Sequence, residues 1–140
     1  MVNMTSHDHK FIIRKLYREF LEQGNVSIAD ELLDHNYIEH DPFPGMEPNI
    51  EGAKKTIAAV HSSLGNIKAN IQEMIAEGNT VAVRLVITAT HIGDFMGVPP
   101  TNRTLNIRRM DFFRFNDGRI TESWMFRDTY GILKQLGIEP

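Results

Sequence analysis

Three aspartates occupy surroundings in which a carboxylate is unusual. Asp111 lies within the apolar run 105–115, Asp128 closes the aromatic segment that contains Trp124, and Asp41 lies in a proline-rich loop. A carboxylate among apolar side chains is costly unless it is paired, solvated in a pocket or kept neutral. Such carboxylates can do acid–base chemistry, for example by removing a proton next to a carbonyl group. We therefore treat Asp41, Asp111 and Asp128 as candidate catalytic residues.

Each aspartate also has an ordinary structural explanation. Asp128 precedes a short helical pattern and could be its N-cap. Asp111 could orient Arg109, or could simply form a salt bridge with Arg109 or with an arginine across the sheet. Asp41, followed by proline, could hold its loop by bonding to the backbone.

Other side chains near these aspartates could complete a site. Tyr17 lies on the apolar stripe of the first helical segment. Its hydroxyl could take part in the acid–base chemistry of a site, or Tyr17 could be a core residue whose hydroxyl is hydrogen-bonded to a neighbour. His40 next to Asp41 could form an acid–base pair. His91 begins a Gly/Pro-rich loop and could face the pocket mouth, and Trp124 is expected in the cavity wall. The residues expected to bind substrate are His40, His91, Phe95, Arg109 and Trp124.

The pattern does not favour metal or cofactor chemistry. The six histidines show no spacing that would place two ligands on one helix. A phosphate-binding glycine loop and a serine nucleophile elbow are also missing from the sequence. We expect no metal site and no cofactor.

Composition limits the class of protein. The 140 residues carry a net charge of −3 and no cysteine, and they contain neither a basic block nor a long apolar run. One domain spanning 1–140 is the simplest organisation. We expect no nucleic-acid or membrane partner and no signal peptide, and a cytoplasmic location is consistent with the absence of cysteine.

Helical and strand patterns follow one another along the chain. Apolar spacing predicts a helix over 11–21, a short one from Ser27, and one over 51–64, with a rigid loop over 37–45. Alternating residues then predict strands, and the chain closes with a helix at 130–136. These strands are expected at 67–75, 81–87, 105–115 and 119–127. Helices followed by an antiparallel meander predict an α+β fold with helices packed on one face of a bent sheet.

Side-chain alternation separates the two faces of that sheet. Residues of the strand over 105–115 that share the face of Asp111, including Arg109 and Phe113, are expected to line the cavity. The opposite face, with Met110 and Phe112, is expected to be covered by a second copy in a homodimer. The loop over 93–103 has Phe95 near its tip and is expected to gate the pocket.

The C-terminal motifs resemble those of the SnoaL-like polyketide cyclases, within the nuclear transport factor 2-like superfamily. The resemblance implies a cone of helices on a bent antiparallel sheet that encloses a pocket. It also implies cofactor-independent cyclisation of an apolar, carbonyl-bearing small molecule, with Asp128 as acid–base in an intramolecular aldol closure. The motifs are Thr90-His91-x-Gly93-x-Phe95-x-Gly97-x-Pro99-Pro100-Thr101-x-Arg103, Asp117-Gly118-Arg119-Ile120-x-Glu122-x-Trp124-x-x-x-Asp128 and Gln135-Leu136-Gly137.

A second resemblance is to the ketosteroid isomerases. The segment Glu39-His40-Asp41-Pro42-Phe43 is similar to the loop that carries their general base. It implies Asp41 as the base, with Tyr17 and a protonated Asp111 donating hydrogen bonds to an enolate. Both families enolise a carbonyl compound. The alternative from another class is a non-catalytic module that binds a small molecule or dimerises.

Overall fold

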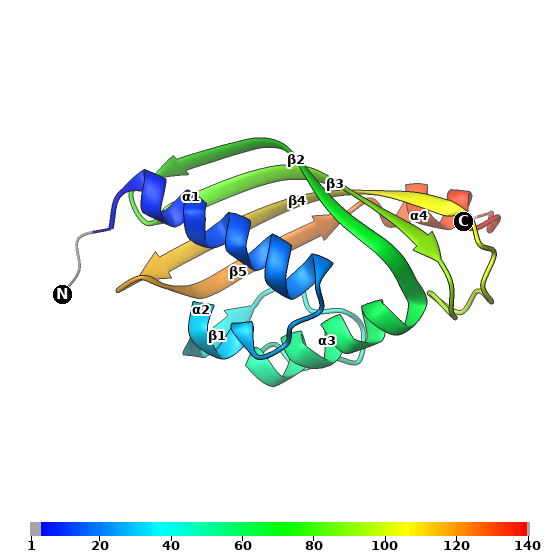
Figure 1. Cartoon of the computed structure of the whole chain (residues 1–140), viewed down its shortest axis with the longest axis horizontal. Coiled ribbons are helices and arrows are strands. Elements are labelled where there is room, and N and C mark those ends of the chain that lie inside the picture. The colour runs from blue at the N-terminus through cyan, green and yellow to red at the C-terminus, as the bar shows by residue number, and fades with distance from the viewer. Residues whose placement is uncertain (1–3, 140) are drawn as a thin grey trace.

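The computed structural model describes residues 4–139 (Figure 1). A capped helix runs into a π-helical turn, a short helix and strand follow, and a third helix leads into four long strands and a closing helix. The elements are α1 (Ser6–Lys15), η1 (Leu16–Glu22), α2 (Ile28–Leu32), β1 (Leu33–Glu39), α3 (Ile50–Ser63), β2 (Leu64–Glu77), β3 (Thr80–His91), β4 (Thr104–Asn116), β5 (Arg119–Arg127) and α4 (Thr129–Gln135).

Local chemistry explains where the long helices begin. At α1, the Thr5 hydroxyl accepts the Asp8 N–H while the Asp8 carboxylate accepts the Thr5 N–H, which forms a capping box. At α3, the Asn49 side chain accepts the Gly52 N–H. The predicted helix over 11–21 therefore starts earlier, at Ser6, and its second half is wound as a π-helix.

The five strands form one sheet in the order β1-β5-β4-β3-β2. Neighbours from β2 to β5 are antiparallel, as predicted, but β1 pairs with β5 in parallel. The prediction of a loop from residue 37 is wrong for 37–39, which belong to β1. The pattern of this short strand is weak because only Tyr37 and Glu39, near its end, alternate inward around the exposed Ile38.

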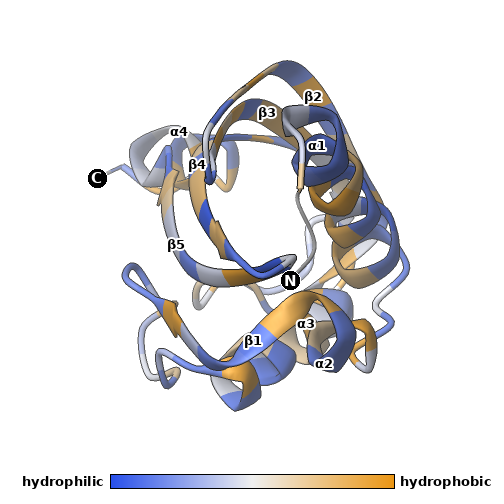
Figure 2. Ribbon diagram, turned by 90° about the vertical axis from the view of Figure 1, so that its left-hand side faces the viewer, coloured by the Kyte–Doolittle hydropathy of each residue, from blue (hydrophilic) through white to orange (hydrophobic). Residues whose placement is uncertain are grey.

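The sheet bends around α1 and η1, and α2, α3 and β1 close the side below (Figure 2). The inner face of β4 is the predicted one: Asp111 and Phe113 are buried, while Met110 and Phe112 are exposed. The predicted α+β cone with helices against a bent sheet is confirmed.

A β-bulge in β5 sets which side chains of that strand point inward. The hairpin turn at Asp117 and Gly118 has positive φ at both residues (49° and 78°), as a type I′ turn requires. Phe115 pairs with Ile120, but Arg114 pairs with Glu122, so Thr121 is the extra residue. Every residue of β5 beyond the bulge is shifted by one position relative to β4.

No helix within residues 4–139 is long and apolar enough to span a lipid bilayer.

Candidate active site

A cavity lies between η1, α3, the segment after β1, and the inner face of β4 and β5. Its volume is about 100 Å³, and two further hollows of about 150 and 40 Å³ adjoin it through Phe43 and Val60. Its wall is mainly apolar and is supplied largely by Leu16, Phe20, Leu21, Phe43, Ile57, Val60 and Met125. Seven polar side chains also line it: Tyr17, Glu39, Asp41, Glu47, Thr56, Arg109 and Arg127.

Tyr17, Asp111 and Arg109 form one buried cluster. The Tyr17 hydroxyl donates to Asp111 Oδ2 at 2.6 Å, and Arg109 donates to the same oxygen from Nη2 at 2.9 Å and from Nε at 3.1 Å. Asp111 Oδ1 also lies 2.9 Å from Arg109 Nε. Burial and the negative charge of Asp111 hold the pKa of Tyr17 well above its usual value. Burial alone would lower the pKa of Arg109, but the Asp111 carboxylate outweighs this effect and raises it.

The π-helical turn places Tyr17 toward this cluster. Leu16, Tyr17, Phe20 and Leu21 are all buried, so the widened turn presents two adjacent pairs of side chains to the cavity. Single π-turns in proteins are frequent at functional sites. The Tyr17 ring also meets Phe113 of β4 edge to face, with ring centroids 6.1 Å apart. Tyr17 is therefore fixed from both sides.

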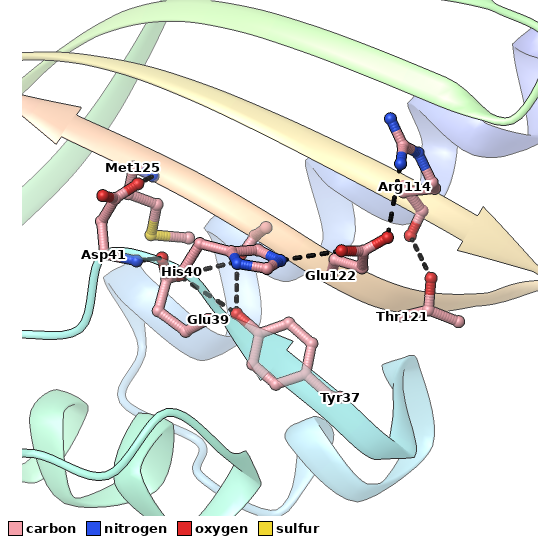
Figure 3. A network of polar contacts seen from close by, with 9 residues as sticks. Tyr37, Glu39, His40, Asp41, Arg114, Thr121, Glu122 and Met125 are labelled. Carbon is pink, nitrogen blue, oxygen red and sulfur yellow. Dashed lines mark hydrogen bonds and ion pairs between the residues drawn. The ribbon is translucent and has the colours of Figure 1, made fainter.

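Glu39 is the centre of a second polar cluster, at the end of β1 (Figure 3). Its Oε1 accepts the Ser123 hydroxyl at 2.6 Å and the Tyr37 hydroxyl at 3.2 Å, and its Oε2 accepts the Asp41 N–H at 2.8 Å. Tyr37 and Ser123 also hydrogen-bond to each other. Burial and the nearby Glu39 carboxylate raise the pKa of Tyr37 far above its usual value. Glu39 is thus a buried carboxylate whose two oxygens are both occupied.

Asp41 is held more loosely than Glu39. Its Oδ2 accepts the backbone N–H of Met125 at 3.1 Å, which ties the loop after β1 to β5 (Figure 3). Among residues 4–139, its Oδ1 receives no hydrogen bond. Asp41 therefore presents a partly exposed carboxylate oxygen to the cavity.

Arg127 stands opposite Arg109 in the register of β4 and β5, so both guanidinium groups enter the cavity from the same face. The Arg127 guanidinium carbon lies 4.3 Å from the centroid of the Phe43 ring. Burial, followed by the positive charge of Arg109, lowers the pKa of Arg127.

Four of the predicted site residues meet at this cavity. Tyr17, Asp41 and Arg109 line it, and Asp111 lies behind Tyr17 and Arg109. Of the alternatives for Asp111, the structure shows the salt bridge with Arg109, located on the cavity side of the sheet. The geometry leaves the catalytic roles of these residues as proposals.

Asp128 was expected in the pocket but lies outside the cavity wall. Its Oδ1 accepts the Gly131 N–H at 2.9 Å as the N-cap of α4, and its Oδ2 lies 3.8 Å from the exposed Arg108. A carboxylate in that position satisfies an otherwise unpaired helix N–H. The placement of Asp128 in the pocket is therefore wrong.

Trp124 and His40 were also placed wrongly. Both lie on the outer face of the sheet, where their rings stack with centroids 4.4 Å apart. His40 Nε2 contacts Glu122 Oε2 at 2.7 Å and points away from Asp41, as Figure 3 shows. His40 and Asp41 are neighbours in the bend after β1, but His40 stacks on Trp124 while Asp41 lines the cavity, so the two side chains do not pair.

His91 supports a loop and does not face the pocket mouth. It is fully buried, its Nδ1 accepts from the Thr101 backbone N–H at 3.2 Å, and its Nε2 lies 3.2 Å from the Val98 carbonyl oxygen. Phe95 of the same loop is buried and borders the two adjoining hollows. The loop is tied to the end of α3 by a hydrogen bond from the Ser63 hydroxyl to the Asp94 carbonyl oxygen.

Four residues of the two polar clusters and the cavity wall were not predicted from the sequence: Glu39, Tyr37, Ser123 and Arg127. The first two could have been found from their alternation with Asp41, since residues 37, 39 and 41 share a face of an extended segment. Ser123 and Arg127 depend on the bulge at Thr121, for which no local residue pattern gives a signal. No group of three or more His, Cys, Asp or Glu side chains within 4–139 is arranged to hold a metal ion.

The model of the SnoaL-like polyketide cyclase family matches residues 11–136. This chain belongs to that family. A nogalonic acid methyl ester cyclase from Streptomyces nogalater is 33% identical over 117 residues, covering 81% of this chain and 87% of the relative. The aklanonic acid methyl ester cyclase DnrD from Streptomyces peucetius is 26% identical over 128 residues, covering 87% and 88%.

Solved structures agree with the family assignment. Wild-type IdmH from Streptomyces antibioticus superposes with a TM-score of 0.80 at 30% identity, covering 92% of this chain and 98% of that one. TsrD from Streptomyces laurentii reaches 0.87 at 21% identity, covering 98% and 100%, and this likeness concerns the fold alone. The predicted family, and with it the prediction of a polyketide cyclase-like enzyme acting on an apolar small molecule, is confirmed.

Proposed function

We propose that this protein closes a ring in an apolar polyketide by an intramolecular aldol reaction, with Asp41 as the general base. The observation that carries the proposal is the Asp41 carboxylate in an apolar cavity that also holds the Arg109 guanidinium. Relatives are named for cyclising aklanonic and nogalonic acid methyl esters. We propose a substrate of the same general class, an apolar molecule with two carbonyl groups that can meet.

Asp41 is preferred to Glu39 as the base because of its free oxygen. Both oxygens of Glu39 accept hydrogen bonds, and hydrogen bonds to the charged form of a carboxylate weaken it as a base. Asp41 accepts one bond at Oδ2 and presents the other oxygen to the cavity. Glu39 instead orients the loop by accepting the Asp41 N–H.

Arg109 is the proposed donor to the enolate. The single hydroxyl proton of Tyr17 is given to Asp111, and both oxygens of Asp111 lie against Arg109, so neither residue is free to donate to a ligand. Arg109 has further N–H donors beyond those on Asp111, and it lines the cavity. Tyr17 and Asp111 then act as positioning residues that hold the guanidinium in place.

The reaction is balanced without a co-reactant. Asp41 removes a proton from a carbon next to one carbonyl, and the resulting enolate carbon attacks the second carbonyl of the same molecule. One carbon–carbon bond forms, and the alkoxide takes back the proton from Asp41. The mainly apolar wall lowers the local dielectric constant, which strengthens the field of Arg109 at the developing enolate.

The test is exchange of the proton next to the carbonyl in deuterated water. The probes are a polycyclic β-keto ester and a Δ5-ketosteroid, followed by NMR. Asp41→Asn should lower the exchange rate by at least ~10²-fold, which is the usual contribution of a general base. Asp128→Asn is the matched control, because asparagine is also a good N-cap and should leave the rate unchanged. Loss of exchange in Asp128→Asn with normal exchange in Asp41→Asn would refute the assignment.

Two other outcomes distinguish the alternative functions. Faster turnover of the ketosteroid than of the β-keto ester would favour isomerase-like proton transfer. Binding of both probes without any exchange would favour a non-catalytic binding module.

We further propose that two copies associate through the outer face of the sheet. That face exposes Met110 by 60% and Phe126 by 68%, beside Phe112 and Trp124. Charges of both signs border it in the Arg84–Glu73 and Arg114–Glu122 pairs, so a two-fold axis could pair them between copies. Light scattering should give twice the chain mass of 16.0 kDa. Phe126→Glu should give the monomer, and a wild-type monomer at micromolar concentration would refute the association.

A further inference from the structure

Arg127 is a second cation in the cavity, and the proposed acid–base mechanism gives it no role. It lies directly across from Arg109, and both side chains line the same cavity. Like charges placed opposite each other on one face of a sheet repel, and the effect grows where water is excluded. An arrangement of this kind needs a compensating negative charge.

Arg109 has a direct ion-pair partner in Asp111, whereas Arg127 forms no ion pair with the part of the chain that the structure describes. Within residues 4–139, no carboxylate lies within 4.0 Å of the Arg127 guanidinium, and no acceptor receives a hydrogen bond from it. Three carboxylates lie close enough to act on its charge: Asp111 is bound by Arg109, Glu39 by Ser123 and Tyr37, and Asp41 accepts the Met125 N–H without forming an ion pair with Arg127. Arg127 is half-buried, so its donors are only partly served by solvent.

The Phe43 ring limits how Arg127 can lie. Its guanidinium carbon is 4.3 Å from the ring centroid, within the range of a cation–π contact. A guanidinium held over an aromatic face keeps the N–H groups at its edge free, and that edge matches the two oxygens of a carboxylate. The loop after β1 thus fixes the orientation of the group.

We infer that Arg127 binds a carboxylate carried by the substrate, so that this chain accepts a free acid where relatives are named for methyl esters. The inference rests on the proposed function for the location of the substrate. A carboxylate at Arg127 would pair the second cation and fix the apolar body of the molecule between Phe43 and η1. A methyl ester offers the same shape but only neutral acceptors, and charged hydrogen bonds are roughly twice as strong as neutral ones.

The test compares 2-naphthoic acid with its methyl ester by calorimetry at neutral pH. Wild-type protein should bind the acid more tightly, by about 10- to 100-fold, as expected for a charge-assisted pair in a partly buried site. Arg127→Gln should remove most of this preference while leaving the affinity for the ester within about 3-fold. Arg127→Lys, which keeps the charge and loses the fork, should retain part of it. Arg14→Gln, an exposed arginine on α1, is the matched control and should change neither affinity.

Several results would overturn the inference. Equal binding of acid and ester by the wild-type protein would do so. So would an unchanged acid-to-ester ratio in Arg127→Gln, even if both affinities fell, because that would indicate a packing role. Binding is measured without turnover, so a failure of proton exchange would count against the proposed aldol chemistry and leave this test intact. Conversely, exchange that depends on Asp41 would survive the loss of any preference for the acid.

Discussion

The buried Asp111–Arg109 pair should be strongly coupled, and a double-mutant cycle measures the coupling. The side chain of Asp111 is fully buried and that of Arg109 is 13% exposed, with 2.9 Å between Oδ1 and Nε. Removing one member leaves the other as a buried charge without its partner, which typically costs about 3–5 kcal/mol. We expect Asp111→Asn and Arg109→Met each to lower the free energy of unfolding by an amount in this range. In each variant, Tyr17 can offer the remaining charged residue only a neutral hydroxyl.

The double variant should lose much less stability than the sum of the losses in the two single variants. With both charges removed, no unpaired ion remains, so Asp111→Asn combined with Arg109→Met should show a coupling energy of at least about 2 kcal/mol. Urea unfolding followed by circular dichroism measures it. With a slope of about 2 kcal/mol per molar, a single loss of 4 kcal/mol lowers the midpoint by roughly 2 M. Additive losses of stability, or a cost below about 1 kcal/mol for Asp111→Asn, would show that the two buried side chains do not depend on each other.

Three further predictions follow from other parts of the structure. The folded pKa values of Tyr17 and Tyr37 lie above the unfolded value, so the native state keeps protons that the unfolded state loses. The free energy of unfolding should therefore be highest below pH 10 and should fall above it by up to ~1.4 kcal/mol per pH unit for each of these tyrosines. Absorbance at 295 nm should show Tyr17 and Tyr37 ionising only as the protein unfolds, and their ionisation in the native state would contradict this. His91→Ala should cost about 2–4 kcal/mol by removing a buried ring and its bonds to the loop, and thermal unfolding measures the loss; a change under 0.5 kcal/mol would show that the ring does not brace the loop. If the loop over 93–103 gates the pocket, Phe95→Ala should weaken probe binding and turnover in a folded protein, whereas unchanged values in both assays would exclude gating.

The errors at Trp124 and Asp128 have a common physical origin. A regular hairpin continuing from the pair Asn116–Arg119 would put Trp124 opposite Asp111, on the cavity side. The extra residue Thr121 shifts the pairing, so Met125 stands opposite Asp111 instead. A shift of one residue reverses the face of every later side chain. Alternation predicted the inner face of β4 correctly, because the two aromatic rings beyond Asp111 make that face apolar, but a bulge has no such local signature.

The position of Asp41 depends on an equally non-local feature. Its loop could be predicted from the prolines, and the isomerase-like segment identified it as a possible base. Its location at the cavity, however, comes from the parallel pairing of β1 with β5 and from the bond between the Met125 N–H and Asp41 Oδ2. Strands that are far apart in the chain and pair in parallel leave no turn signal between them.

The strand β5 therefore organises most of the polar chemistry of the cavity. Ser123 fixes Glu39, the backbone of Met125 holds Asp41, and Arg127 supplies the second cation, all at inward positions after the bulge. With regular pairing these positions would be taken by Glu122, Trp124 and Phe126, and the hydroxyl that fixes Glu39 and the cation opposite Arg109 would both be lost. A single inserted residue thus brings the support of Glu39 and the proposed carboxylate-binding group to the cavity, which is why the chemistry of the side chains was easier to predict than their assembly.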